Sequence, residues 1–350
     1  MVFVQERTSK GVKYLYLDKS IRVQNKIYKI SKYLGKKSDI SKHQLKEAIK
    51  KFALEIDERI VDHITHHLRK TLTFTYPFSI EDVKTIERMN LKYKEIRNTL
   101  APKDWNDIKK RFVANFVFES NALEGNSLTL KNFTEIIFEN KVAGSSDLRE
   151  VYDAKNSYQV FSKLFTAKKE ITEAFIIDLH RKIMNNIDER TGYKKIPNVI
   201  LGKRLQLSPP EQVPHKMKTL LTWYGTHKNR LHPLELAFRF HHQFEQIHPF
   251  ADGNGRVGRM LLDYILIKQG YYPIIIRNSH RNKYLKALPI GIFDNHNNFD
   301  ILNTSILFMV SFKKRLYLCF REMLDPYILS GNSVRITTLL LFFFKSSESS

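Results

Sequence analysis

The most informative stretch of the sequence is His248-Pro249-Phe250-Ala251-Asp252-Gly253-Asn254-Gly255-Arg256-Val257-Gly258-Arg259. Apolar residues recur at helical spacing on both sides of it, in residues 234–247 and 257–268. We therefore expect a loop that leads into the first turn of a buried helix. The free N–H groups and the positive dipole end of such a turn favour an anion.

The glycines of this loop indicate a phosphate site. Gly253 and Gly255 flank Asn254, and because they lack a Cβ the backbone can approach phosphate oxygens as an anion nest. Arg256 and Arg259 are three positions apart, so both can grip phosphate oxygens from one helical face. The sequence has no GxxxxGK[ST] or GxGxxG motif, so neither a P-loop nor a dinucleotide-binding fold competes with this interpretation.

Two further side chains of the loop add chemistry. Asp252 is a hard oxygen ligand of the kind that holds Mg²⁺ between phosphates. His248, with an ordinary pKa of about 6.5, is mostly neutral at pH 7 and can take a proton from a hydroxyl group. Together these residues predict metal-assisted transfer of a phosphate-containing group.

The loop resembles the signature of the Fic family, HxFx(D/E)GNGRxxR, and matches it at every fixed position. The resemblance implies that ATP binds with Mg²⁺ and that AMP passes to a Ser, Thr or Tyr hydroxyl of a target protein. It makes His248 the general base and Asp252 the Mg²⁺ ligand, while Asn254 and the nest cradle the phosphates. It assigns the β- and γ-phosphates to the two arginines. The nucleotide-binding residues expected in this loop are Asp252, Gly253, Asn254, Gly255, Arg256, Val257, Gly258 and Arg259.

A second stretch resembles the family's inhibitory motif, (S/T)xxxE(G/N). It begins at Ser120 and places Glu124 before Gly125. At a helix end Glu124 could reach Arg259, neutralise the charge that should hold the γ-phosphate, and repel that phosphate. The resemblance therefore implies an enzyme that Glu124 holds inactive.

Residues 193–205 are rich in β-formers and interrupted by a proline, so we expect a short hairpin. This hairpin resembles the family's flap, which aligns an acceptor segment by strand addition. The flap residues expected near the nucleotide are Leu201, Gly202, Lys203 and Arg204. The match departs from the family at Lys194, where arginine is frequent, and at residues 201–202, where a glycine pair is frequent. Tyr284 stands where the family has an aromatic residue near adenine, and a core tyrosine is the alternative.

Composition limits the class of protein. The chain has 350 residues, 42% of them hydrophobic, and a net charge of +22, which favours polyanionic partners. The longest apolar run, residues 339–344, is far shorter than the roughly 20 residues of a membrane-spanning helix, so we expect no membrane association. The single cysteine and a first segment unlike a signal peptide indicate a cytoplasmic protein.

The N-terminal part is disproportionately basic. Residues 1–50 hold thirteen Lys and Arg against four Asp and Glu, a net charge of +9. Residues 12–23 and 27–30 alternate as the strands of a hairpin, and Ser41 with Gln44 predicts a capped helix that runs to about residue 70. The fold class that we expect is mainly α, a Fic-type helical core with a flap hairpin, preceded by a basic hairpin and helix. The expected parts are residues 1–75, 76–325 and 326–350.

Three functions remain open at this point. The first is a protein adenylyltransferase that is inhibited by Glu124 and acts on a target protein with an acceptor hydroxyl. The second uses the same site in reverse, to hydrolyse an AMP–protein bond. The third is a regulator that binds nucleic acid through residues 1–75. The sequence leaves a homodimer open as well.

Overall fold

The computed structural model describes residues 3–23, 26–74, 79–142, 146–198 and 207–288. The chain divides into two compact units, Met1–Thr99 and Leu100–Ser350. Within the described part, no helix has both the length and the apolar character needed to cross a bilayer. The boundary expected near residue 75 and the expected C-terminal part, residues 326–350, lie outside the described residues.

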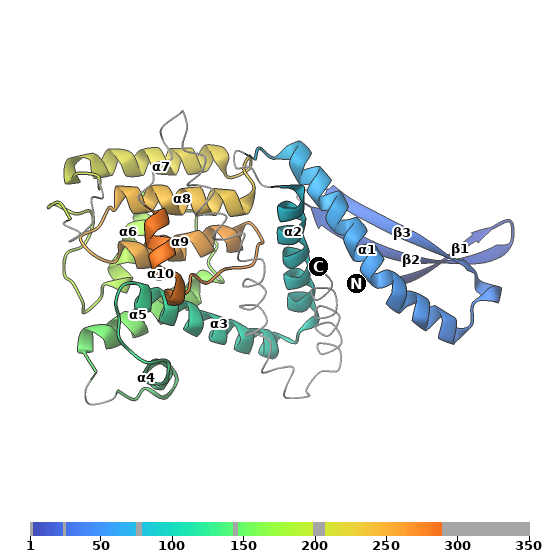
Figure 1. Ribbon diagram of the computed structural model, residues 1–350, viewed down its shortest axis with the longest axis horizontal. Helices are drawn as coiled ribbons and strands as arrows, with labels where there is room; N and C mark the ends of the chain where they lie inside the picture. The colour runs from blue at the N-terminus through green and yellow to red at the C-terminus, as the bar shows by residue number, and fades with distance from the viewer. Residues whose placement is uncertain (1–2, 24–25, 75–78, 143–145, 199–206, 289–350) are drawn as a thin grey trace. The chain divides into compact units, whose positions relative to one another are not determined.

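The first unit contains an antiparallel sheet of three strands in the order β1-β2-β3 (Figure 1). The strands are β1 (Phe3–Ser9), β2 (Val12–Val23) and β3 (Lys26–Lys36). The two strands that the sequence predicts are present, with β3 longer than expected. Strand β1 was not predicted, because its side chains are mostly exposed and an exposed edge strand carries no alternating apolar pattern.

Two helices complete this unit. After the short 3₁₀ turn η1 (Lys37–Asp39), α1 (Lys42–Thr71) begins at the predicted capping box. The Ser41 Oγ accepts a hydrogen bond from the N–H of Gln44, and the Gln44 Oε1 accepts one from the N–H of Ser41. Helix α2 is Ile80–Thr99. The core joins one face of the sheet to α1 and includes Leu17, Ile30, Ile56, Ile60, Val61 and Leu91.

The second unit is built from helices that are joined by loops. Its first elements are α3 (Pro102–Leu123), α4 (Leu130–Thr134), the π-helical turn η2 (Glu135–Glu139), α5 (Leu148–Leu164) and α6 (Glu173–Ile183). They are followed by η3 (Pro210–Gln212), α7 (Val213–His227), α8 (Pro233–Ile247), α9 (Asn254–Lys268), η4 (Asn278–His280) and α10 (Arg281–Ala287).

Helices α8 and α9 lie at the centre of this unit, with α3, α5, α6 and α7 around them (Figure 1). Every residue of α9 from Asn254 to Leu266 is buried. Helix α8 was expected to be amphipathic, yet it is buried on nearly all sides because α7 and α9 both pack against it. The loop between α8 and α9 is therefore held by two buried helices.

The structure differs from the sequence analysis at the start of α9 and in the expected flap hairpin. The helix after the glycine-rich loop begins at Asn254, three residues earlier than the apolar spacing alone predicts, because polar residues and glycine form its first turn. The described part of the expected flap, residues 193–198, forms bends with no strand. Residues 199–206, which include most of the predicted flap site, lie outside the described residues.

Candidate active site

The loop 248–253 is shaped by left-handed backbone at both ends. His248 ends α8 with φ 49°, and Gly253 precedes α9 with φ 77°. The Asn254 side chain ties the loop together, since its Oδ1 accepts a hydrogen bond from the N–H of Phe250 and its Nδ2 donates one to the Phe250 carbonyl, both at 2.8 Å. Asn254 therefore shapes the loop, and its expected part in the phosphate cradle stays a prediction.

His180 of α6 packs against the loop. Its Nε2–H donates to the Asp252 carbonyl at 3.0 Å, and its ring stacks on Phe250 with the two centroids 3.8 Å apart. Burial lowers the pKa of His180, so the ring is neutral at pH 7. The loop is thus held on both sides before any ligand binds.

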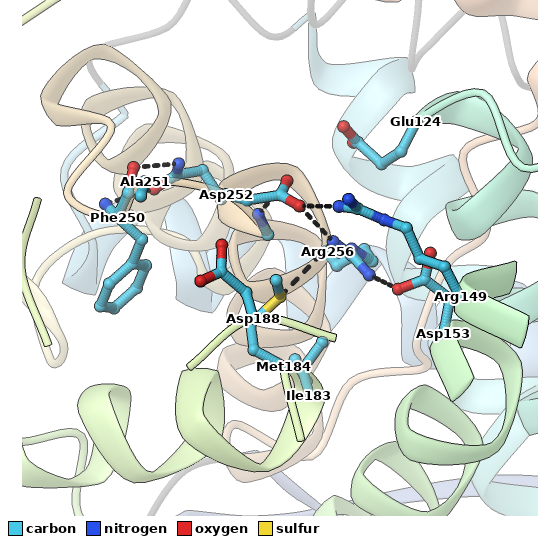
Figure 2. A network of polar contacts seen from close by, with 12 residues as sticks. Glu124, Arg149, Asp153, Ile183, Met184, Asp188, Phe250, Ala251, Asp252 and Arg256 are labelled. Carbon is cyan, nitrogen blue, oxygen red and sulfur yellow. Dashed lines mark hydrogen bonds and ion pairs between the residues drawn. The ribbon is translucent and has the colours of Figure 1, made fainter. Parts of the chain in front are cut away.

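Arg256 points into a buried acidic setting (Figure 2). One guanidinium nitrogen is bonded to the Asp153 carboxylate of α5, and another lies 3.6 Å from the Met184 sulfur. Burial raises the pKa of Asp153, and the Arg256 charge opposes that rise. Arg256 is only 3% exposed, whereas the neighbouring Asp252 is 34% exposed.

Asp252 is held by cations and by the backbone (Figure 2). Its Oδ2 is bonded to Arg149 of α5 and lies 3.5 Å from Arg256, while its Oδ1 accepts from the N–H of Gly253 at 2.6 Å. The described residues contain no group of three or more His, Cys, Asp and Glu side chains that could hold a metal ion by themselves. A single half-exposed carboxylate fits Mg²⁺ that is held mainly by nucleotide phosphates.

Arg259 is fixed by groups of α3. Its Nε donates to the Ser120 Oγ, and its Nη2 donates to the Ser120 carbonyl, both at 2.9 Å. The same Nη2 donates to the Glu124 Oε1 at 2.7 Å. Burial opposes the charge of Arg259, yet the Glu124 carboxylate raises its pKa, so the pair is ionic. Ser120, Glu124 and Arg259, which the sequence analysis expected to lie together, are therefore in contact.

The Glu124 carboxylate also lies against the first turn of α9. A Cβ on Gly255 would stand 2.1 Å from the Glu124 Oε1, so glycine is required for this approach. The carboxylate therefore occupies the anion-favouring helix N-terminus that the sequence assigned to phosphate. Its side chain is still 42% exposed, so solvent reaches it.

His248 stands at the mouth of the site with its side chain 20% exposed. Burial, together with the charge of Lys194, lowers the pKa of His248 to about 4. Within the described residues the Lys194 Nζ is buried and has no hydrogen-bond partner, and burial lowers its own pKa to about 8. The imidazole is therefore neutral at pH 7 and able to accept a proton.

Tyr284 lies inside the core. Its hydroxyl is 3.0 Å from the His241 Nε2 and accepts from the Arg259 Nη1 at 3.4 Å, and the residue is 3% exposed. This arrangement fits the core tyrosine that the sequence left as the alternative. Val257 is fully buried, and the residues Leu201, Gly202, Lys203 and Arg204 lie outside the described part of the chain.

The sequence analysis missed several residues of this site. Arg149 contacts Asp252 of the loop and Asp153 contacts Arg256 of α9, each 103 positions away, and no local pattern reveals these pairings. Glu245 could have been found, because His241, Glu245 and His248 share one helical face by spacing. Its carboxyl lies between the two rings, 4.0 Å and 3.9 Å from their Nδ1 atoms.

Comparison with known proteins places this geometry in a family. Residues 170–266, which include the loop and most of α9, match the model of the Fic/DOC family. This part of the chain is therefore similar to Fic/DOC domains. The matched region of the Fic domain begins just before α6 and ends within α9, so α3 with Glu124 lies outside it.

Two relatives that are named protein adenylyltransferases match part of the chain. A probable protein adenylyltransferase of Aquifex aeolicus is 38% identical over 136 residues, 39% of this chain and 42% of the relative. The protein adenylyltransferase Fic of Drosophila yakuba is 31% identical over 189 residues, 52% of this chain and 38% of the relative. The chain thus spans less than half the length of these two relatives.

A Fic domain containing signaling protein of Bacteroides thetaiotaomicron superposes with a TM-score of 0.60 at 26% identity, over 68% of this chain and 96% of that one. The predicted Fic-like, mainly helical fold is confirmed.

Proposed function

We propose that this protein transfers AMP from ATP to a hydroxyl group of a target protein. The observation that carries the proposal is a neutral His248 beside a glycine-rich helix N-terminus that holds Arg256 and Arg259. The names of the Aquifex and Drosophila relatives support the same reaction. The hydroxyl oxygen forms a bond to the α-phosphorus, the bond from that phosphorus to the bridging oxygen breaks, and pyrophosphate leaves.

Each site residue has a role in this reaction. His248 takes the hydroxyl proton, and the N–H groups of the first turn of α9 bind phosphate oxygens. Arg256 and Arg259 neutralise phosphate charge. Asp252 would hold Mg²⁺, which would screen the charge of the phosphates.

We infer that Glu124 keeps this site inactive. Its carboxylate lies at the N-terminus of α9 and accepts a hydrogen bond from the Arg259 Nη2 at 2.7 Å. A γ-phosphate needs both this helix N-terminus and this arginine. A bound phosphate would also meet the repulsion of the carboxylate. Release of Glu124 is therefore the step that admits ATP in the reactive pose.

The test is mass spectrometry of proteins incubated with Mg²⁺ and a mixture of nucleoside triphosphates. Glu124→Gly should gain AMP on itself or on an added target, and Glu124→Gly/His248→Ala should not. Glu119→Gln is the matched control, because Glu119 lies on the same helix and pairs with Arg277 instead of Arg259. If Glu124→Gly binds ATP but no protein gains AMP in any mixture, the proposal fails.

The reverse reaction is the alternative at the same site. The exposed side of the Glu124 carboxylate could orient a water molecule toward an AMP–protein bond. Removal of the carboxylate separates the two: it should increase transfer under the first proposal and abolish hydrolysis under the second. A preparation of AMP-modified target protein, incubated with wild type and with Glu124→Gly, provides the readout.

We propose a second role for the outer face of the N-terminal sheet, which is turned away from α1. Tyr33 is 53% exposed there, and its ring centroid is 6.1 Å from that of Tyr14 and 5.4 Å from that of Tyr16. The Arg7 guanidinium lies 4.1 Å above the Tyr16 ring. Aromatic rings among cations suit the stacked bases of single-stranded nucleic acid.

Fluorescence anisotropy of the full chain with a labelled single-stranded oligonucleotide tests this role. Tyr33→Ala should weaken binding by about 1–3 kcal/mol, and affinity should fall steeply with salt. Tyr158→Ala, in the second unit, is the control. Binding that is absent at low salt, or equal in the two variants, rejects the role of this face.

A further inference from the structure

A buried carboxyl group beside the loop, that of Glu245, has no role in the proposed transfer of AMP. Glu245 of α8 has a side chain that is 8% exposed, and within the described residues its Oε1 has no hydrogen-bond partner. An unpaired buried polar atom costs stability, so its presence calls for an explanation.

The Glu245 carboxyl faces two imidazole rings. Its Oε2 lies 3.9 Å from the Nδ1 of His248, and its Oε1 lies 4.0 Å from the Nδ1 of His241. The Glu245 carboxyl thus approaches the Nδ1 side of the reactive histidine.

Helix α9 leaves room for this carboxyl. A Cβ on Gly258 would lie 2.4 Å from the Glu245 Oε1 and 3.0 Å from the His241 Nδ1. Any side chain at position 258 would therefore push the carboxyl or the His241 ring away. The glycine, which the signature leaves variable, makes the close approach of α8 and α9 compatible with a buried Glu245.

The side chains of His241, Glu245 and His248 are mainly neutral at pH 7. Burial raises the pKa of Glu245 to about 8, a rise that Arg259 opposes and Glu124 adds to. Burial lowers the pKa of His241 to about 3 and that of His248 to about 4. A neutral imidazole carries one N–H and one lone pair, so the tautomer decides which nitrogen can act as a base.

We propose that Glu245 is a positioning residue for His248: its carboxyl oxygen faces the Nδ1–H of the ring and thereby leaves the Nε2 lone pair for the acceptor hydroxyl. The inference rests on the proposed role of His248 as the base. The hydroxyl O–H bond breaks, an Nε2–H bond forms, and the imidazolium keeps its Nδ1–H toward Glu245. A carboxyl group that orients a catalytic histidine in this way fixes its tautomer.

The tautomer can be measured without any reaction. Long-range ¹H–¹⁵N spectra of ¹⁵N-histidine-labelled full-length protein distinguish a protonated from an unprotonated ring nitrogen, and His248→Ala identifies the His248 signals. In wild type at pH 7 we expect Nδ1 protonated and Nε2 unprotonated. Glu245→Met should shift the Nδ1 signal of His248 toward the unprotonated position. Glu245→Gln should keep the wild-type pattern, because an amide offers the same acceptor oxygen.

The outcomes separate this inference from the proposed function. A protonated Nε2 in wild type overturns the role of Glu245, and so does a Glu245→Met spectrum equal to that of wild type. The wild-type result stands even if the methionine variant does not fold. Glu211→Gln, an exposed change on η3, is the control and should leave every histidine signal in place. Because the readout uses the free enzyme, failure of AMP transfer leaves it unaffected.

Discussion

Burial, more than any partner, decides the charge of His248. The ring loses water at the mouth of the site, and the nearby Lys194 ammonium adds to the cost of a second positive charge. A base whose pKa is about 4 is unprotonated throughout the neutral range. Such a base is ready at pH 7, at the expense of a weaker affinity for the proton that it must take.

The acid limb of the rate profile should therefore lie well below the ordinary pKa of histidine. For Glu124→Gly, kcat/KM for ATP should change little between pH 7 and pH 5.5, because His248 stays neutral there. A histidine with a pKa of 6.5 would lose roughly tenfold over that range. Lys194→Met removes the neighbouring charge and should move the limb to higher pH. A tenfold loss in the Glu124→Gly protein would contradict the prediction.

Arg149 forms an ion pair with Asp252, the carboxylate that would hold Mg²⁺. The pair is exposed, with 57% of the Arg149 side chain and 34% of the Asp252 side chain accessible, so it contributes little stability and is easily displaced. Arg149→Gln should therefore strengthen Mn²⁺ binding in the presence of a non-hydrolysable ATP analogue by several-fold, as measured by electron paramagnetic resonance. Arg181→Gln, an exposed arginine of α6 that pairs with Asp178, is the control. Unchanged or weaker Mn²⁺ binding would show that Arg149 does not compete with the metal.

At the scale of elements, the close contact of α8 and α9 depends on one glycine. Gly258→Ala would place a methyl group 2.4 Å from the Glu245 Oε1. Because α8 and α9 are buried along most of their length, neither can shift easily to relieve the strain, and we expect a loss of about 1–3 kcal/mol in the stability of α9. Hydrogen exchange of the α9 amides measures it. Gly225→Ala on α7, where a Cβ meets nothing within 4 Å, should show no such loss.

Local signals predicted the elements better than the contacts between them. The capping box at Ser41 and the helices around the loop could be predicted because their determinants lie within a few residues. Strand β1 could not, since its side chains meet solvent. The partner of Arg256 could not either, because Asp153 approaches only when α5 packs beside α9. The hydrogen bonds by which the Asn254 amide closes the loop on Phe250 could not be predicted either, since nothing local shows them, and the phosphate contact of Asn254 stays a prediction.

At the scale of the whole molecule, the net charge of +22 overstates the free positive charge. Asp18, which is fully buried, accepts ion pairs from Arg7 at 2.9 Å and Lys29 at 2.8 Å. Lys19 is buried between Asp57 and Glu95. Part of the basic character of the N-terminal unit therefore holds that unit together, and only the remainder is available to a polyanion.

The dependence of stability on pH reflects opposing buried groups in the second unit. The folded state holds the pKa values of His241 and His248 near 3 and 4, so the stability that these neutral rings provide above pH 6.5 is lost as the pH falls. Glu245 acts in the opposite direction: its folded pKa of about 8 exceeds the ordinary 4.5, so its contribution grows as the pH falls from 8. Arg259 and Glu124 both bear on Glu245, and Arg259, whose pKa is raised, keeps its charge between pH 7 and pH 5.

Glu245→Gln removes the group whose contribution to stability grows as the pH falls, and leaves His241 and His248, whose contribution is lost. Its α9 amides should lose protection between pH 7 and pH 5 by on the order of 1–2 kcal/mol more than those of wild type, once intrinsic exchange rates are corrected for pH. The same measurement on α1, in the first unit, serves as the internal control and should not distinguish the two proteins. Equal pH dependence of the α9 amides in both proteins would mean that Glu245 is already ionised at pH 7, and the neutral cluster around His248 would have to be abandoned.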